Sequence, residues 1–224
     1  MSVRLEEQST ADPLRNVAVF LGAGIPDSDR WSGYFDAREI TDAVVAAARA
    51  VLTAGGVLVS AMHPTVAPLL LHVAAEFPVA ADQPRVLIYQ SALYESVIPP
   101  TTRRFEEQGV GALRIVESSP DDNLESGRRE ASLLLMRERM FKETTPRAGI
   151  FIGGMDGIKA ELHLLRSVIP GSWSYPVAKP GGVSAELTEY APKEVRELLS
   201  ESAVYPTVFR KIVEDLTSRL AAES

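Results

Sequence analysis

The strongest constraint on the fold is an alternation along the chain between short apolar runs and longer amphipathic stretches rich in Ala and Leu. The short runs are mostly continuous, which is typical of parallel strands covered by helices on both faces. The alternation indicates βαβ units. It therefore predicts an α/β fold with a mostly parallel sheet of six to seven strands. The six runs that we expect to form strands are residues 16–22, 56–61, 85–90, 111–117, 148–153 and 174–179.

Between and after these runs lie segments with helical periodicity and with recognisable start or stop signals. Gly55 and Gly56 end one of them, and Pro64 begins the next. Helices on both faces of the sheet would make a Rossmann-like three-layer sandwich. We expect a single domain over residues 13–224 after a polar, flexible N-terminal tail at residues 1–12. The expected helices are residues 37–53, 65–76, 99–108, 122–143, 157–168, 183–200 and 205–221.

Charge and composition exclude several classes of function. The chain of 224 residues carries a formal charge of −7, which argues against a nucleic-acid surface because phosphate neutralisation needs a basic patch. The sequence has no cysteine and no long apolar run, so we expect a cytoplasmic protein without disulfides and without a membrane partner. The histidines, His63, His72 and His163, lack metal-ligand spacing, and no metal or cofactor is expected.

Glycine-rich turns follow two of the expected strands. Gly22 and Gly24 follow the first strand, and the segment GGMDGIKAE follows the fifth. In an open parallel sheet, ligands bind beyond the carboxyl ends of the strands. Gly157 would open a helix whose free N–H groups and positive dipole end suit a phosphate. We therefore expect the phosphate of a ligand to rest on Gly153, Gly154 and Gly157.

Two charged residues near this turn have alternative interpretations. Glu161 lies one turn inside the helix, on the side of its apolar residues. It is either a helix-start carboxylate that complements the dipole or an acid/base group directed at the ligand. Arg139 lies in the preceding helix, where it could simply pair with Glu143 four residues later. Spacing alone favours the simpler interpretation for both.

The segment MRERMFKETTPRAGIFIGGMDGIKAE, of 26 residues, resembles the paired motifs of the LOG-type cytokinin-activating phosphoribohydrolases and of the wider SLOG superfamily. Those motifs are M-H-x-R-K on a helix and, after a strand, P-G-G-x-G-T-x-x-E. The resemblance implies that Arg139 and Glu161 are the catalytic pair and that the glycines bind phosphate. It also implies hydrolysis of the N-glycosidic bond of a nucleoside 5′-monophosphate.

The sequence departs from those motifs in ways that remove polar contacts to phosphate. Arg137 stands for the motif histidine, Met140 for the lysine and Ile158 for the threonine, while Asp156 adds a negative charge. These departures are more similar to SLOG domains that sense nucleotide-derived signals, such as cyclic ADP-ribose isomers in bacterial defence. The sensor interpretation adds further expected ligand contacts, namely Met155, Asp156, Ile158, Lys179, Gly181, Gly182, His63 and Tyr94.

Three functions therefore stay open. The first is a nucleotide-ligand sensor, the second a nucleotide phosphoribohydrolase, and the third a domain that has lost its ligand and serves in assembly. The resemblance also implies a homodimer or a higher homo-oligomer, and it allows for a TIR-type or other effector partner that is encoded nearby. Glycine turns contact the phosphate and the ribose of a ligand. The sequence therefore predicts neither the base of the ligand nor the number of its phosphates.

Overall fold

The structure is a computed structural model that describes residues 12–78, 84–117 and 125–223. Six strands, all parallel, form one sheet in the order β4-β3-β2-β1-β5-β6. The α/β prediction is confirmed, and each of the six expected strands is present. The N-terminal tail lies, up to residue 11, outside the described residues. The strands are β1 (Ala18–Gly24), β2 (Val57–Ala61), β3 (Val86–Ser91), β4 (Ala112–Val116), β5 (Ala148–Gly153) and β6 (Trp173–Val177).

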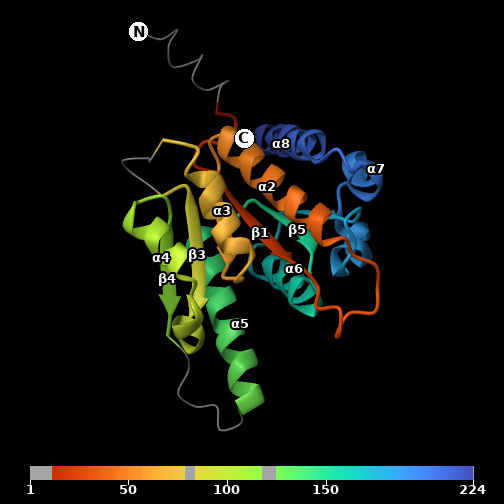
Figure 1. The fold of residues 1–224 in the computed structure, drawn as a ribbon. Helices are drawn as coiled ribbons and strands as arrows, with labels where there is room; N and C mark the ends of the chain where they lie inside the picture. The colour runs from red at the N-terminus through yellow and green to blue at the C-terminus, as the bar shows by residue number, and fades with distance from the viewer. Residues whose placement is uncertain (1–11, 79–83, 118–124, 224) are drawn as a thin grey trace, which may run out of the picture.

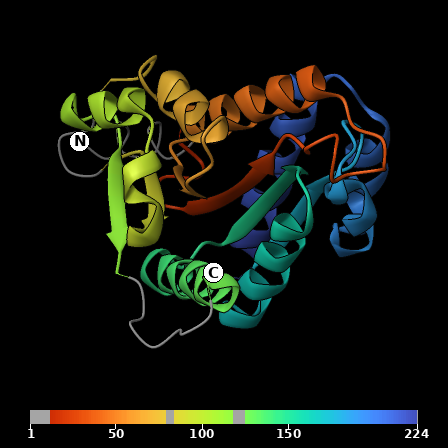
Figure 2. The same cartoon turned by 60° about the horizontal axis from the view of Figure 1, so that its bottom comes forward.

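Helices cover both faces of the sheet, as Figures 1 and 2 show. One apolar cluster packs α2, α3 and α8 against one face, and a second packs α5, α6 and η2 against the other. The result is a three-layer sandwich, as expected from continuous apolar strands. The helices are α2 (Ala37–Thr53), α3 (Val66–Ala74), α4 (Pro100–Glu107), α5 (Glu125–Thr144), α6 (Asp156–Val168), α7 (Lys193–Glu201) and α8 (Tyr205–Ala222), with 3₁₀ turns η1 (Ala92–Val97) and η2 (Val183–Tyr190).

The helices differ from the expectation in one segment. Residues 183–200 were expected to form one helix, but the structure divides them into η2 and α7. Ala191 has extended backbone angles of φ −69° and ψ 143°, because a following proline disfavours the helical region. Pro192 then starts the next helix, where its missing N–H costs nothing. After this break the chain leaves the face of the sheet that η2 covers and continues as α7 on the face that α8 covers.

The strand order places a topological switch between β1 and β5. From β1 the chain proceeds outward through β2, β3 and β4, whereas β5 lies on the other side of β1 and leads to β6. Connections that leave a parallel sheet in opposite directions open a crevice at the carboxyl ends of the strands. The ends of β1 and β5, at Gly24 and Gly153, pair directly with each other. The glycine turns named above therefore meet at this crevice.

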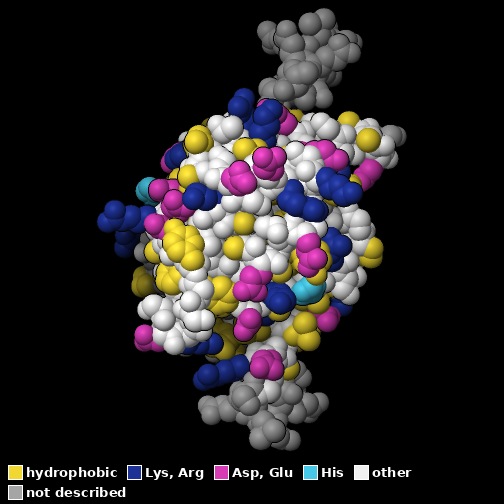
Figure 3. All heavy atoms as spheres, turned by 90° about the vertical axis from the view of Figure 1, so that its right-hand side faces the viewer, with side chains coloured by type: hydrophobic (Ala, Val, Ile, Leu, Met, Phe, Trp, Pro, Cys, Tyr) yellow, Lys and Arg dark blue, Asp and Glu magenta, His cyan; other side chains and the backbone are white. Residues whose placement is uncertain are grey.

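None of the helices in the described part of the chain is long and apolar enough to cross a membrane. On the face seen in Figure 3, Lys and Arg side chains are interspersed with Asp and Glu side chains. The two apolar clusters described above hold the fold together. No single-sign charge field dominates that face.

Candidate functional site

A pocket of about 250 Å³ lies at the carboxyl ends of β1, β2 and β5, between α5 and α6. This is the switch-point crevice where an open parallel sheet binds ligands. Its floor is made by strand ends and glycines, and its walls by side chains from the two helices. The residues that line it are Gly22, Ala23, Gly24, Ile25, Ser60, Ala61, Met62, His63, Leu133, Met136, Arg137, Gly154, Met155, Gly157, Ile158 and Glu161.

An ion pair between α5 and α6 dominates the charge of this pocket. The Arg137 Nε donates to Glu161 Oε1 at 3.0 Å, and the side chains are only 18% and 7% exposed. The bond uses the Nε edge of the guanidinium. Its two Nη groups make no hydrogen bond within the described residues. Because a guanidinium presents five N–H donors in a fixed fork, Arg137 has unused donors on its outer edge.

The buried carboxylate of Glu161 sits beneath the glycine of the first strand. A Cβ at Gly22 would lie 2.8 Å from Glu161 Oε2, so glycine is needed there to admit the carboxylate. Burial raises the pKa of Glu161 above its ordinary value, and the nearby Arg137 guanidinium offsets part of this rise. Glu161 is thus a carboxyl group that is desolvated, oriented and easier to protonate than a surface glutamate.

The N-terminus of α6 faces the same pocket. The backbone N–H groups of Met155, Asp156 and Gly157 have no acceptor among the described residues, as expected at the start of a helix. A Cβ at Gly157 would lie 3.5 Å from the Nη2 atom of Arg137. The guanidinium therefore lies over the first turn of the helix. Free N–H groups, the positive dipole end and a guanidinium together suit a phosphate.

The paired glycines at the end of β5 shape the turn rather than donate to a ligand. The N–H of Gly153 donates to Ser184 Oγ at 2.9 Å, and the N–H of Gly154 donates to the Gly24 carbonyl at 2.6 Å. Both glycines have positive φ, of 64° and 69°, which favours glycine. The free N–H groups of the site therefore begin one residue later, at Met155.

Gly181 and Gly182 support this turn from behind. A Cβ at Gly182 would lie 2.6 Å from the Gly153 carbonyl carbon, and one at Gly181 would lie 2.3 Å from the Tyr34 carbonyl oxygen. The N–H of Gly182 donates to that same Tyr34 oxygen. Neither glycine lines the pocket. Their contribution in the structure is to allow close packing of two backbone segments.

His63 follows β2 and faces the pocket from the side of β1. Its Nδ1 accepts the backbone N–H of Thr65 at 3.4 Å, so the ring proton of the neutral form belongs on Nε2. That Nε2 atom would lie 3.6 Å from a Cβ at Gly24. Burial lowers the pKa of His63, which favours the neutral ring. His63 can therefore donate one hydrogen bond from Nε2 toward a ligand hydroxyl or phosphate oxygen.

Besides Gly153, Gly181 and Gly182, four of the expected contacts do not line the pocket, namely Arg139, Lys179, Tyr94 and Asp156. Arg139 is 54% exposed and bonds Glu143 at 2.6 Å, so the structure does not bring it to Glu161. The arginine that meets Glu161 in the structure is Arg137. Lys179 and Tyr94 follow β6 and β3 but do not line the pocket, and Asp156 is exposed at the helix start.

The position of Arg137 could have been found from helical periodicity. Leu133, Met140 and Phe141 stand four residues before it and three and four residues after it, and therefore share its side of α5. Met140 and Phe141 are fully buried in the second apolar cluster. Arg139 falls on the opposite side of the helix, where Glu143 is exposed. The phase of the apolar residues thus distinguishes the two arginines.

Comparison with known protein families gives one result that covers most of the chain. The model of the SLOG cluster3 family matches residues 31–213. The match includes β2 through α7 and all the pocket residues except those that end β1 and begin the loop after it. No curated protein matches the chain.

Proposed function

The chain belongs to the SLOG cluster3 family, and from this membership and the geometry of the pocket we propose that it binds a nucleotide-derived ligand. The family fits a role in binding or processing nucleotide-related molecules. The pocket of about 250 Å³ lies just below the range of about 300–1,000 Å³ that is usual for small-molecule sites. It suits one phosphoribosyl group, with the rest of the ligand extending past the rim.

One observation carries this proposal: the Arg137 guanidinium lies beside Gly157, in the first turn of α6, where the backbone N–H groups are free. A phosphate at that point would accept hydrogen bonds from the backbone of Asp156 and Gly157 and from the Nη groups of Arg137. Glu161 keeps the guanidinium oriented by holding its Nε edge. His63 Nε2 would reach the ligand from the opposite wall.

We favour sensing over hydrolysis for two reasons that concern the pocket's chemistry. The Glu161 carboxylate is buried, and one of its oxygens is bonded to Arg137. The apolar side chain of Ile158, only 6% exposed, lines the pocket, and it stands for the threonine in the motif of the LOG-type phosphoribohydrolases that the sequence resembles. These features suit a site that holds a ligand, such as an ADP-ribose derivative, and signals through a homo-oligomer or an effector partner.

A nucleotide phosphoribohydrolase is the second candidate, and the raised pKa of Glu161 favours it. A carboxyl group with a raised pKa is protonated at a higher pH than a surface glutamate, and in that form it can donate a proton to a departing base. After deprotonation, the same carboxylate could stabilise an oxocarbenium-like ribosyl centre. Arg137 would then hold the 5′-phosphate in a fixed position.

Two assays separate the candidates. Calorimetric titration with AMP, NAD, ADP-ribose and cyclic ADP-ribose isomers measures binding, and chromatography of the same mixtures detects free base. We expect saturable binding of at least one of these ligands without base release. Base release that Glu161→Gln abolishes would make the protein a hydrolase. No binding to any of them, by a protein that purifies without nucleotide, would leave only an assembly role.

A further inference from the structure

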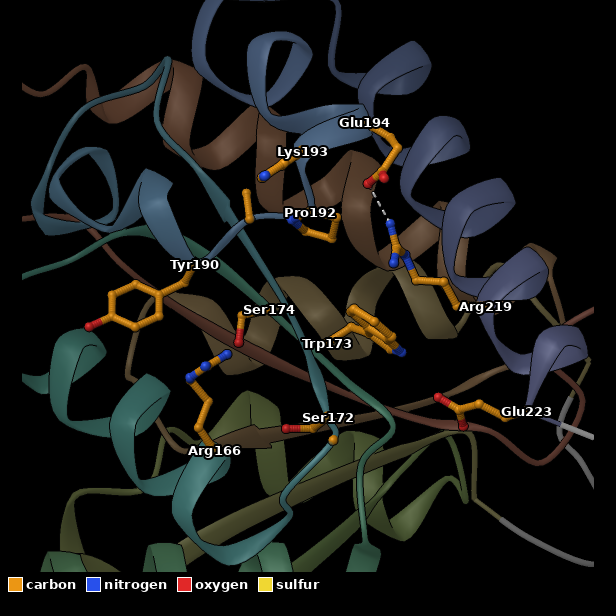
Figure 4. A pocket seen from close by; sticks show the side chains of 12 residues that line it. Arg166, Ser172, Trp173, Ser174, Tyr190, Pro192, Lys193, Glu194, Arg219 and Glu223 are labelled. Atoms are coloured by element: carbon orange, nitrogen blue, oxygen red, sulfur yellow. Dashed lines mark hydrogen bonds and ion pairs between the residues drawn. The ribbon is translucent and has the colours of Figure 1, made fainter.

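A second pocket, of about 500 Å³, lies at the outer edge of the sheet beside β6 (Figure 4). β6 is an edge strand, with β5 as its only neighbour in the sheet. The end of α6, the end of η2, the start of α7 and the end of α8 form the walls. This edge pocket shares no lining residue with the pocket at the glycine turn.

The edge pocket contains buried hydroxyl groups that have no hydrogen-bond partner. Ser172 and Ser174 are 7% and 1% exposed, and the Oγ atoms of both lack a partner, as does Nε1 of Trp173 between them. Buried polar groups in folded proteins are nearly always hydrogen-bonded. The two serine hydroxyls, which lie on the same side of the strand in Figure 4, are therefore an anomaly that a polar ligand would resolve. The Trp173 ring extends to the other side, where the Arg219 guanidinium lies 4.2 Å from its centre.

The free charge around the edge pocket is positive. Glu223 pairs with Arg147, whereas Glu194 and Asp215 share Arg219, at 2.7 and 2.6 Å, which leaves one negative charge uncompensated there. Arg166 and Lys193 are exposed, and neither has a carboxylate partner among the described residues. Two cations without a carboxylate partner thus line the same pocket as the two buried, unpaired hydroxyls.

The position of Arg166 connects these groups. Its guanidinium lies 5.0 Å from the centre of the Tyr190 ring, and Figure 4 shows the side chain extending toward Tyr190 and Ser174. That ring contact is the one interaction found for Arg166 in the described part of the chain, so the side chain can change rotamer within nanoseconds. Such a turn would uncover the hydroxyls and present the guanidinium to the same ligand.

We propose that the edge pocket is a second ligand site, which binds the phosphate group of a small molecule. Two serine hydroxyls, a guanidinium and an ammonium offer more donors, from more directions, than the two coplanar oxygens of a carboxylate can accept. A tetrahedral phosphate accepts them all. The site is independent of the proposed function of the glycine-turn pocket.

The test is a titration of the full chain with inorganic phosphate, followed by the indole N–H signals in ¹H–¹⁵N NMR spectra. The protein has two tryptophans, and Trp31, which does not line the edge pocket, serves as the internal reference; Trp31→Phe assigns the signals. We expect a saturable shift of the Trp173 signal. Chloride at equal ionic strength should not produce it, and acetate should do so only weakly.

Variants of the pocket decide whether the shift reports this site. Ser174→Ala removes an unpaired oxygen, so it should fold as well as the wild type while weakening phosphate binding by about tenfold. Arg166→Gln combined with Lys193→Gln should abolish the shift. The matched control, Arg210→Gln with Lys211→Gln, removes two charges elsewhere on α8 and should leave it intact. No Trp173 shift, or equal binding in all variants, would overturn the proposal.

Discussion

Replacing Arg137 with methionine is expected to destabilise the protein by about 3–5 kcal/mol, because the substitution leaves the buried carboxylate of Glu161 without its partner. Methionine keeps the length and the helix propensity of the side chain. The loss therefore reports the uncompensated charge rather than the helix. The free energy of unfolding, from urea titrations followed by circular dichroism, measures it.

A matched control lies two residues along the same helix. Arg139→Met removes the same group from an exposed position where the arginine pairs only with Glu143. Surface ion pairs contribute little, so this variant should stay close to the wild type. Adding Glu161→Gln to Arg137→Met should restore most of the lost stability. Equal losses for the two arginine variants would contradict the burial of the pair.

The stability of Arg137→Met is also expected to depend on pH, and the sign of this dependence follows from linkage. Burial raises the pKa of Glu161 in the folded protein, and removing Arg137 takes away the charge that offsets this rise. The folded variant then binds a proton more readily than the unfolded chain, so its stability increases as the pH falls. The deficit of Arg137→Met should thus shrink as the pH is lowered toward the ordinary glutamate pKa.

Gly182→Ala is expected to cost about 3 kcal/mol or more, because strain and a backbone clash combine at this position. Gly182 has φ 71° and ψ −171°, a region that is almost confined to glycine. An added Cβ would also lie 2.6 Å from the Gly153 carbonyl carbon. The backbone of the glycine turn at Gly153 would have to move to admit this Cβ.

Gly171→Ala separates the two contributions. Gly171 also has positive φ, of 93°, but a Cβ there would meet nothing within 4 Å. Its substitution therefore measures the conformational cost alone, about 1–2 kcal/mol. Thermal unfolding of both variants gives the comparison. If the two lose the same stability, the close packing of Gly182 against the glycine turn is not a determinant of the fold.

Most of the fold follows from the sequence because its strands are continuous apolar runs. Buried parallel strands such as Ile150–Ile152 appear in the sequence as continuous apolar runs, because helices cover both faces of the sheet. The 3₁₀ turn η1 was not expected. The N–H of Leu93 donates to Ser91 Oγ, which caps this turn, and such bonds depend on backbone geometry that apolar periodicity does not report.

The candidate site was predictable as a place but not in its details. Parallel topology brings Gly22, Gly24 and the α6 start to one edge. Which glycine N–H groups are free depends on cross-strand partners, and the bonds from Gly153 to Ser184 and from Gly154 to Gly24 join residues far apart in sequence. The motif likewise pointed to Arg139, whereas the packing of α5 turns Arg137 inward.

The central claim is that Arg137 and the start of α6 hold the phosphate of a phosphoribosyl group. Its most direct test is a ³¹P NMR titration of ribose 5-phosphate with the wild type, Arg137→Lys and Arg139→Lys. Arg137→Lys keeps a charge beside Glu161 but loses the guanidinium fork. The account predicts saturable binding that Arg137→Lys weakens by about tenfold or more and Arg139→Lys leaves unchanged. Absence of binding by the wild type, or dependence on Arg139 in place of Arg137, would contradict it.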